Sequence, residues 1–333
     1  MKVFVSGLAG FLGSHIAERY RDLGCQVVGI DNLYGGSRHN VPDGVRLEIL
    51  DCLDRDSYKD ILAGSDIVYH CAAAAYDGFS VFSPAYVYRN TVQATVEIAS
   101  ASIAADTGRF VFCSSMARYG ALPAPFTESQ VPRPSTPYGV AKYTCELLVS
   151  NLYEIHGGDY SIAIPHNIIG PRQRYDDPYR NVASIMINRM LQGLQPIIYG
   201  DGSHVRCFSF VDDVIYCLEK MGTSPLAIGE AINIGPDEGA VTILGLANEI
   251  ASILDFDLDP IFVPERPREV STATCRADKA RRLLGYRTET TLRDGLANMV
   301  EWIERIGPRA FSYDLEIEIP RAITPATWTD KLI

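Results

Sequence analysis

Two groups of hydroxyl and amine side chains in this chain could carry acid–base chemistry, and the first is a tyrosine with a lysine. Tyr138 and Lys142 lie four residues apart in a segment with helical apolar spacing, Pro137–Ile155, so both are expected on one face of a helix. Tyrosine hydroxyls titrate near pH 10, and a cation one turn away favours the ionised phenolate. The pair could therefore act as a general base near neutral pH. Alone, this spacing is common and also suits two surface residues.

The second group is a pair of serines. Ser114 and Ser115 follow a short apolar run, Arg109–Cys113, that reads as a strand. The carboxyl edge of a parallel sheet is where ligands bind, so a serine there can hydrogen-bond a reacting hydroxyl and order proton transfer. A plain strand-to-loop cap is the alternative. Taken with the tyrosine and lysine, the pattern favours a catalytic set of Ser115, Tyr138 and Lys142.

A glycine-rich turn near the start of the chain predicts a phosphate-binding site. Gly7, Gly10 and Gly13 lie between a predicted strand, Val3–Ser6, and a predicted helix, Phe11–Leu23. Glycines let the backbone approach a pyrophosphate, and the helix N-terminus offers free N–H groups and a positive dipole end. The spacing is G-x-x-G-x-x-G, which differs from the G-x-G-x-x-G fingerprint of many dinucleotide sites.

An acid at the end of the second predicted strand indicates which dinucleotide is bound. Asp31 stands eighteen residues after Gly13, close to where a carboxylate holds the adenine-ribose hydroxyls. Its charge would repel a 2′-phosphate, which favours NAD over NADP. Arg38, nearby, is the counter-indication, and a simple turn-forming acid is the alternative for Asp31.

The elements that must position these residues alternate between strands and helices, which predicts parallel βαβ units. The first half contains six strand-like runs and three long helical segments, and after Pro165 the chain changes to Gly- and Pro-containing loops with shorter helices. We therefore expect an α/β fold, a Rossmann-type doubly wound parallel sheet with a smaller C-terminal α/β substrate lobe. The expected strands are Val3–Ser6, Gln26–Ile30, Arg46–Ile49, Ile67–His70, Arg109–Cys113 and Tyr160–Ile164, and the helices include Pro84–Ala105, Val182–Gln192 and Thr242–Leu254.

The expected domains follow this change of pattern. Residues 1–166 form the NAD-binding domain, with returns to the sheet near 206–235 (Arg206–Val214 and Ala231–Ile234), and residues 167–306 are mainly the substrate-binding lobe. Residues 307–333 form a charged, proline-containing C-terminal tail to which the sequence assigns no role.

Composition limits the classes of partner. The formal net charge is −11 over 333 residues, which argues against a general nucleic-acid or anionic-membrane surface. There is no signal-like start and no apolar run long enough for a membrane span. None of the eight cysteines forms a C-x-x-C pair, so we expect reduced, buried thiols in a cytoplasmic protein and no metal site.

In these motifs the sequence resembles the extended short-chain dehydrogenase/reductases, and specifically the NAD-dependent sugar-nucleotide epimerase/dehydratase family. The resemblance extends to about Ile306. It rests on Gly7–Gly13, Asp31-Asn32, Asp51-Cys52, His70–Ala73, Asn90-Thr91, Ser114–Gly120, Pro137–Lys142, His166–Arg172, Gly200–Arg206, Phe210–Asp213, Asn233–Gly235 and Arg266–Val270.

The resemblance implies a role for each matching position. Asp51 and Cys52 would meet the adenine, and Ala72 and Ala73 would line the cofactor pyrophosphate or ribose. The full set of implied cofactor residues is Gly7, Gly10, Phe11, Leu12, Gly13, Asp31, Asn32, Asp51, Cys52, Ala72, Ala73, Asn90, Ser114, Tyr138, Lys142, Pro165 and His166. The implied substrate residues are Ser115, Asn167, Tyr199, Arg206, Arg266 and Ala273, with the arginines on a nucleotide diphosphate.

Two departures from the family pattern affect these roles. Arg268 stands where the pattern usually has glycine, which weakens the assignment of Arg266. Arg118 stands where it usually has valine, and it could face the sugar or form an ion pair elsewhere.

The resemblance also indicates the reaction. Family dehydratases carry an Asp-Glu pair where this chain has Met116 and Ala117, decarboxylases a glutamate at the second of these positions, and 3,5-epimerases a cysteine there. Without those groups, we expect epimerisation of a nucleotide-activated hexose, most simply a UDP-hexose, at C4 through a 4-keto intermediate. A sugar-nucleotide dehydrogenase or reductase is the alternative enzyme, and a non-enzymatic NAD-binding regulator is the alternative outside enzymes.

Two further expectations come from the same resemblance. A gatekeeper of the sugar pocket lies six residues before Lys279, at Ala273. A small residue there leaves room for a 2-acetamido group, so UDP-glucose, UDP-galactose and their N-acetyl forms are expected substrates, unless Ala273 merely packs in the lobe. Family members commonly form homodimers through the helices matching Pro84–Ala105 and Pro137–Ile155, so a homodimer is expected.

Overall fold

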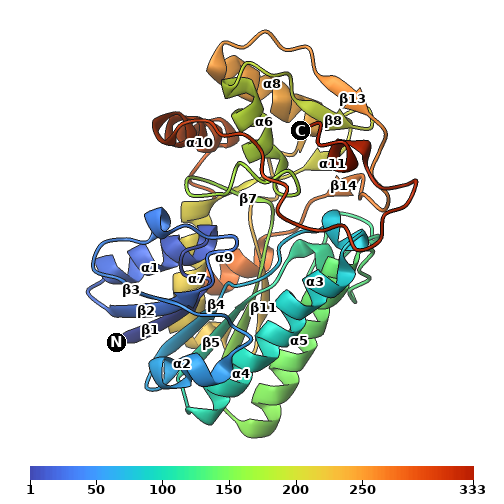
Figure 1. The fold of residues 1–333 in the computed structure, drawn as a ribbon. Coiled ribbons are helices and arrows are strands. Elements are labelled where there is room, and N and C mark those ends of the chain that lie inside the picture. The colour runs from blue at the N-terminus through green and yellow to red at the C-terminus, as the bar shows by residue number, and fades with distance from the viewer.

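A seven-stranded parallel sheet forms the centre of the computed structural model, which describes residues 1–333. Its strand order, β11-β6-β5-β4-β1-β2-β3, reverses direction between β1 and β4 (Figure 1). This is the doubly wound order of a Rossmann sheet, so the predicted fold class is confirmed. All six predicted strands form, with ends within one residue of expectation. The seven strands are β1 (Lys2–Ser6), β2 (Gln26–Asp31), β3 (Arg46–Ile49), β4 (Ile67–His70), β5 (Arg109–Cys113), β6 (Asp159–Pro165) and β11 (Ala231–Ile234).

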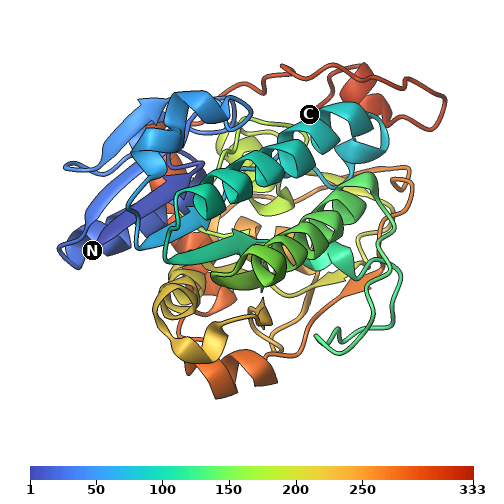
Figure 2. The same ribbon diagram turned by 90° about the horizontal axis from the view of Figure 1, so that it is seen from below.

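Helices cover both faces of the sheet because successive residues of each buried strand point to opposite sides. In β1, Val3 and Val5 belong to one apolar core with the first helix and two helices from later in the chain, whereas Phe4 belongs to the other. The first layer holds α1 (Phe11–Asp22), α7 (Val211–Thr223) and α9 (Asp278–Leu284). The second holds α2 (Arg55–Leu62), α4 (Ala94–Ala104) and α5 (Pro137–His156). Figure 2 shows α4 and α5 side by side over one face of the sheet.

The helix predicted over Pro84–Ala105 is interrupted by a wider turn. It consists of α3 (Pro84–Tyr88), a π-helical turn at Arg89–Gln93, and α4. Such single π turns often occur at functional sites. This one carries Asn90, whose side-chain amide donates to the Tyr86 carbonyl at 2.9 Å and which lines the cavity described below.

The smaller lobe has a core of its own and sits above the carboxyl edge of the sheet (Figure 1). Its three helices are α6 (Val182–Leu191), α8 (Ile243–Leu254) and α10 (Leu292–Ile306), and β8 (Ile197–Tyr199) pairs with β13 (Ile261–Val263) beside them. Short two- and three-stranded ladders join lobe and sheet: β7 (Ile168–Ile169) with β10 (Ser209–Phe210), and β9 (Val205–Arg206) with β12 (Val241–Thr242) and β14 (Thr272–Ala273). The predicted domain boundaries stay a prediction. None of the helices has both the length and the apolar character of a membrane span.

The tail, residues 307–333, crosses the junction of sheet and lobe and ends in α11 (Ala326–Thr329) and the C-terminus (Figure 1). Trp328 is 2% exposed and packs edge-on against Phe79, Phe82 and Tyr179, with ring centroids 5.4–6.1 Å apart. The carboxylate of Glu318 accepts the backbone N–H groups of Ala85 and Tyr86 and thereby caps the start of α3. The tail is therefore packed into the fold, which its charged sequence did not indicate.

Candidate active site

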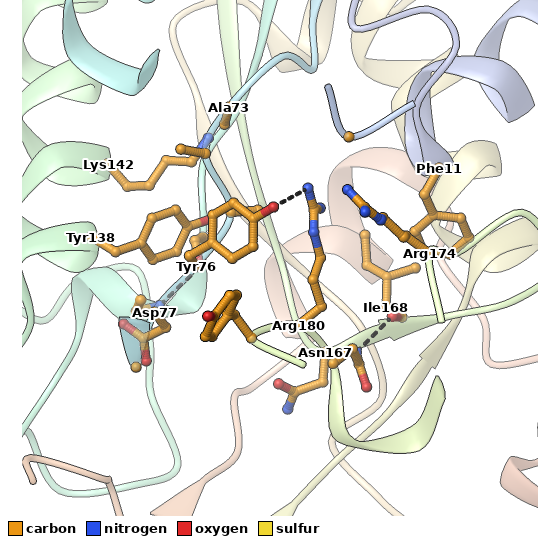
Figure 3. Close-up of a pocket in the computed structure, with 18 of the residues that line it drawn as sticks. Phe11, Ala73, Tyr76, Asp77, Tyr138, Lys142, Asn167, Ile168, Arg174 and Arg180 are labelled. Carbon is orange, nitrogen blue, oxygen red and sulfur yellow. Dashed lines mark hydrogen bonds between the residues drawn. The ribbon is translucent and has the colours of Figure 1, made fainter. Parts of the chain in front are cut away.

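A single large cavity lies at the carboxyl edge of the sheet, between the sheet and the lobe (Figure 3). Of the positions expected to bind cofactor or substrate, only His166 does not line it. The imidazole of His166 is buried against Gly235, and burial lowers its pKa to about 3. The ring is therefore neutral and part of the packing. The cavity lining includes Gly7, Gly10, Phe11, Leu12, Gly13, Asp31, Asn32, Asp51, Cys52, Ala72, Ala73, Asn90, Ser114, Ser115, Tyr138, Lys142, Pro165, Asn167, Tyr199, Arg206, Arg266 and Ala273.

The glycine turn has the geometry that a bound diphosphate needs. A Cβ on Gly13 would come within 2.1 Å of the Gly7 carbonyl oxygen, and Gly7 itself has φ +74°. Only glycines therefore allow the turn to pack this closely against the start of α1. No side chain caps α1 at its N-terminus, and no acid lies in its first turn. Phe11 and Leu12 in that turn line the cavity, so the helix presents its positive end to a ligand.

Asp31 is fixed at the end of β2 beside this turn. Its carboxylate accepts the backbone N–H groups of Ala9 at 3.0 Å and Leu33 at 2.7 Å, and it is 7% exposed. Burial raises the pKa of the carboxyl, and these backbone donors oppose the rise. Arg38, the counter-indication, is exposed and does not line the cavity.

The Tyr138–Lys142 pair lies on the first turns of α5. Thr136 caps this helix by accepting the Gly139 N–H at 3.1 Å. The ammonium of Lys142 donates to the carbonyl of Cys113, the last residue of β5, at 2.7 Å, and lies 6.0 Å from the Tyr138 ring centroid. Both residues are buried, at 3% and 8% exposed. A positive charge is thus held close to the phenol with little solvent to screen it.

The two serines have different surroundings. The Ser114 hydroxyl donates to the carboxylate of Glu146, which also pairs with Arg118 at 2.6 Å. Ser115 caps a short turn by accepting the Ala117 N–H at 3.2 Å, and it lines the cavity. Of the two expectations for Arg118, the structure therefore shows the ion pair, because this arginine does not reach the cavity. Burial raises the pKa of Glu146 to about 7, against the opposing effects of Arg118 and Ser114.

Two apolar side chains occupy the positions on which the expected reaction depends. Met116 and Ala117 both line the cavity. Neither can donate or accept a proton, so the wall beside Ser115 contributes no acid or base at these positions.

The far end of the cavity is lined by arginines. Arg266 stacks on the ring of Tyr199, 4.5 Å from its centroid, and makes two hydrogen bonds to Glu269 at 2.8 and 2.9 Å. Arg206 lies 3.7 Å from the same carboxylate. Arg268 has φ +65°, a left-handed conformation in which glycine is the unstrained residue. The backbone therefore keeps the glycine conformation although the residue is arginine, and Arg266 still lines the cavity.

Several residues that line the cavity or hold its lining in place were missed from the sequence. Tyr76 donates to Asp177 at 2.8 Å and accepts from Arg180 at 3.1 Å. Figure 3 shows the bond between Tyr76 and Arg180. Tyr76 is about a hundred residues from Asp177 and Arg180 in the sequence, and no pattern links it to them. Asp77 was missed because it lies in an irregular stretch after β4. Glu146 could have been found, because it lies one helical turn beyond Lys142.

Comparison with known proteins identifies the family. The geometry defines an α/β fold of the nucleotide-binding type, with a cavity that contains a serine, a tyrosine and a lysine. The family model described as "NAD dependent epimerase/dehydratase family" matches residues 3–235. The chain belongs to this family, and the resemblance stated from its motifs is confirmed.

The similar proteins include several 4-epimerases. The chain is 30% identical over 312 residues to a UDP-glucose 4-epimerase from Mycolicibacterium smegmatis, covering 91% of this chain and 98% of the relative. It is 29% identical, with a TM-score of 0.86, to the UDP-glucose 4-epimerase of Thermotoga maritima solved with UDP-glucose, covering 92% and 99%. The same identity, TM-score and coverage hold for a UDP-N-acetylglucosamine 4-epimerase from Methanobrevibacter ruminantium M1 solved with UDP-N-acetylmuramic acid. Other relatives are named as dehydratases and decarboxylases of nucleotide sugars.

The surroundings of Asp31 predict the choice of cofactor. Because its carboxylate is fixed at the end of β2, a 2′-phosphate would meet a buried negative charge, so the protein should bind NAD and bind NADP poorly. Calorimetric titration of the cofactor-free protein with each dinucleotide measures the difference. Equal affinities would contradict the role of Asp31 and would point to Arg38 as a phosphate ligand.

Proposed function

We propose that this protein epimerises a nucleotide-activated hexose at C4, using bound NAD and a transient 4-keto sugar. The observation that carries the proposal is one cavity that holds the glycine turn, Ser115 and Tyr138 beside a buried Lys142, and no acid at positions 116 and 117. These groups suffice for reversible oxidation of a hydroxyl. Met116 and Ala117 cannot act as the acid or base that would divert the keto sugar into dehydration or decarboxylation.

The roles of the residues follow from their positions. Tyr138 takes the proton of the C4 hydroxyl, and the ammonium of Lys142 stabilises the phenolate electrostatically. Ser115 hydrogen-bonds the same hydroxyl and orients it. NAD, which the residues around the glycine turn and Asp31 would hold, would supply a group that accepts a hydride and can give it back. The keto sugar must rotate within the cavity, so that its opposite face is reduced. Tyr138 then gives back the proton.

The nucleotide end of the substrate is assigned to the lobe. We place the diphosphate on Arg206 and Arg266, whose planar donors match phosphate oxygens, with Asn167 and Tyr199 beside them. UDP is the expected nucleotide because the similar 4-epimerases are named for UDP-sugars.

The sugar is expected to include N-acetylhexosamines. Ala273 lines the cavity on β14, in register with Arg206 on β9. Its methyl group leaves space where a larger side chain would meet a 2-acetamido group. The similar enzyme named for UDP-N-acetylglucosamine is in keeping with this proposal.

The assembly and location of the protein belong to the same proposal. We expect a cytoplasmic homodimer that pairs through α3, α4 and α5. Exposed apolar side chains on these helices support it: Tyr88 is 58% exposed, Val140 49% and Leu147 53%. A surface groove lined by residues of α3 and α5 lies on the same face.

A panel of nucleotide sugars tests the proposed reaction. Purified protein that retains NAD should interconvert UDP-glucose and UDP-galactose without added cofactor, because the hydride is returned in each turnover. Anion-exchange chromatography of the products measures this, with GDP-, dTDP- and CDP-hexoses as comparisons. Net accumulation of NADH with an oxidised sugar would support the dehydrogenase alternative instead. NAD binding without turnover of any sugar would support a regulator.

Replacing the tyrosine tests the base. Tyr138→Phe removes the proton acceptor and little else, so turnover should fall by about 10²–10⁴-fold while NAD stays bound. Steady-state kinetics and the NAD released from denatured protein give the two readouts. Wild-type turnover in this variant would show that another group is the base.

Enlarging the gatekeeper tests the sugar pocket. Ala273→Tyr should abolish turnover of UDP-N-acetylglucosamine. Turnover of UDP-glucose should change by only about a few-fold, because the substitution removes space and no catalytic group. The ratio of kcat/KM for the two substrates measures the effect, and Ala273→Ser is the control because it adds almost no volume. An unchanged ratio, or a wild-type protein that processes only the plain hexoses, would contradict the role of Ala273.

A further inference from the structure

One carboxylate in the cavity has no assigned role. Asp77 lies in the loop after β4, lines the cavity and is exposed to it. Its Oδ1 accepts a hydrogen bond from the Thr136 hydroxyl at 2.5 Å, and Oδ2 has no hydrogen-bond partner. Figure 3 shows Asp77 and Tyr138 among the side chains that line this cavity.

The loop that carries Asp77 is tied to the helix of the catalytic tyrosine. Thr136, which holds Asp77, is also the cap of α5. The Ser80 hydroxyl accepts the Tyr138 N–H at 3.0 Å and donates to the Asp77 carbonyl at 2.6 Å. These bonds fix the carboxylate relative to the phenol.

The other side of the same loop faces the arginines. A Cβ built on Gly78 would lie 3.6 Å from Nη1 of Arg266. The charged groups that act most strongly on Asp77 are Arg266, Glu269 and Arg206. The loop that carries Asp77 thus contacts the start of α5, which holds Tyr138, on one side and Arg266 on the other. In a nucleotide sugar, the hexose lies between the reacting hydroxyl and the diphosphate.

We propose that Asp77 is a specificity-determining residue that accepts hydrogen bonds from a neutral sugar and disfavours a sugar carrying a carboxylate. The proposal rests on the proposed function, because the path of the hexose is set by the two ends of the substrate. A diphosphate on Arg206 and Arg266 would engage the two cations that oppose the charge of Asp77 most strongly. A uronate would then place a second carboxylate beside Asp77 while those two arginines are occupied by the diphosphate.

Binding measurements on the NAD-loaded protein test the assignment. Calorimetric titration with UDP, UDP-glucose and UDP-glucuronate is compared between wild type and Asp77→Asn, which keeps the shape and can still accept from Thr136. Wild type should bind UDP-glucuronate at least about tenfold more weakly than UDP-glucose. Asp77→Asn should bring the two affinities together, with UDP itself bound as in wild type.

Glu265→Gln is the matched control, because it removes a carboxylate from the smaller lobe at a residue that does not line the cavity and pairs only with His204. It should keep the wild-type preference. Equal binding of the two sugars by wild type, or an unchanged preference in Asp77→Asn, would overturn the proposal. A change in UDP binding as large as the change in UDP-glucose binding would also overturn it, because Asp77 would then act on the arginines. If the expected binding preferences are found but the protein epimerises no sugar, only the proposed function would be overturned.

Discussion

The buried ammonium of Lys142 on the Cys113 carbonyl is the interaction on which the geometry of the site depends. It joins α5 to the carboxyl end of β5, where the two serines begin. A buried lysine is costly unless its donors are satisfied, so the contact leaves α5 little freedom to slide along the sheet. Tyr138, one turn earlier, is placed by the same contact. The cation therefore has two effects, because it positions the helix and supplies positive charge next to the phenol.

The ends of this helix segment are held by polar side chains that are themselves buried. One turn after Lys142, Glu146 connects Ser114 to Arg118. An unpaired carboxylate there would be strongly destabilising, since burial already raises its pKa to about 7. The ion pair with Glu146 therefore gives a structural reason for an arginine at position 118, where the family pattern usually has valine. At the other end, Thr136 and Ser80 tie the helix start to the loop after β4, which brings a segment with no regular structure into a fixed position.

How far the site could be predicted depends on whether a residue belongs to a periodic or sharply constrained segment. The strands, Gly7, Gly13, Tyr138 and Lys142 were found because strand ends, a glycine turn and helical spacing fix where such residues lie. Their meeting in one cavity follows from the parallel sheet alone. Arg118 could not be decided, since its partner Glu146 becomes a neighbour only when α5 packs beside β5. Asp77 and Arg180 lie in irregular segments, where their surroundings are set by tertiary contacts and no local pattern exists.

The tail shows how the substrate end of the cavity differs in origin from the catalytic end. Similar proteins cover 91–92% of this chain, and the resemblance in motifs stops near Ile306, where the tail begins. Trp328 packs under the loop that carries Asp77, with its ring 3.7 Å from a Cβ built on Gly78. The hydroxyl of Thr327 meets that of Tyr199 at 2.5 Å, and Ile333 lines the cavity. The Ser–Tyr–Lys set thus lies on the shared sheet and α5, whereas the wall that we assign to the sugar is partly built from a segment outside the family motifs. We therefore expect the residues that the tail supports to determine substrate preference, and those that the sheet supports to determine the reaction.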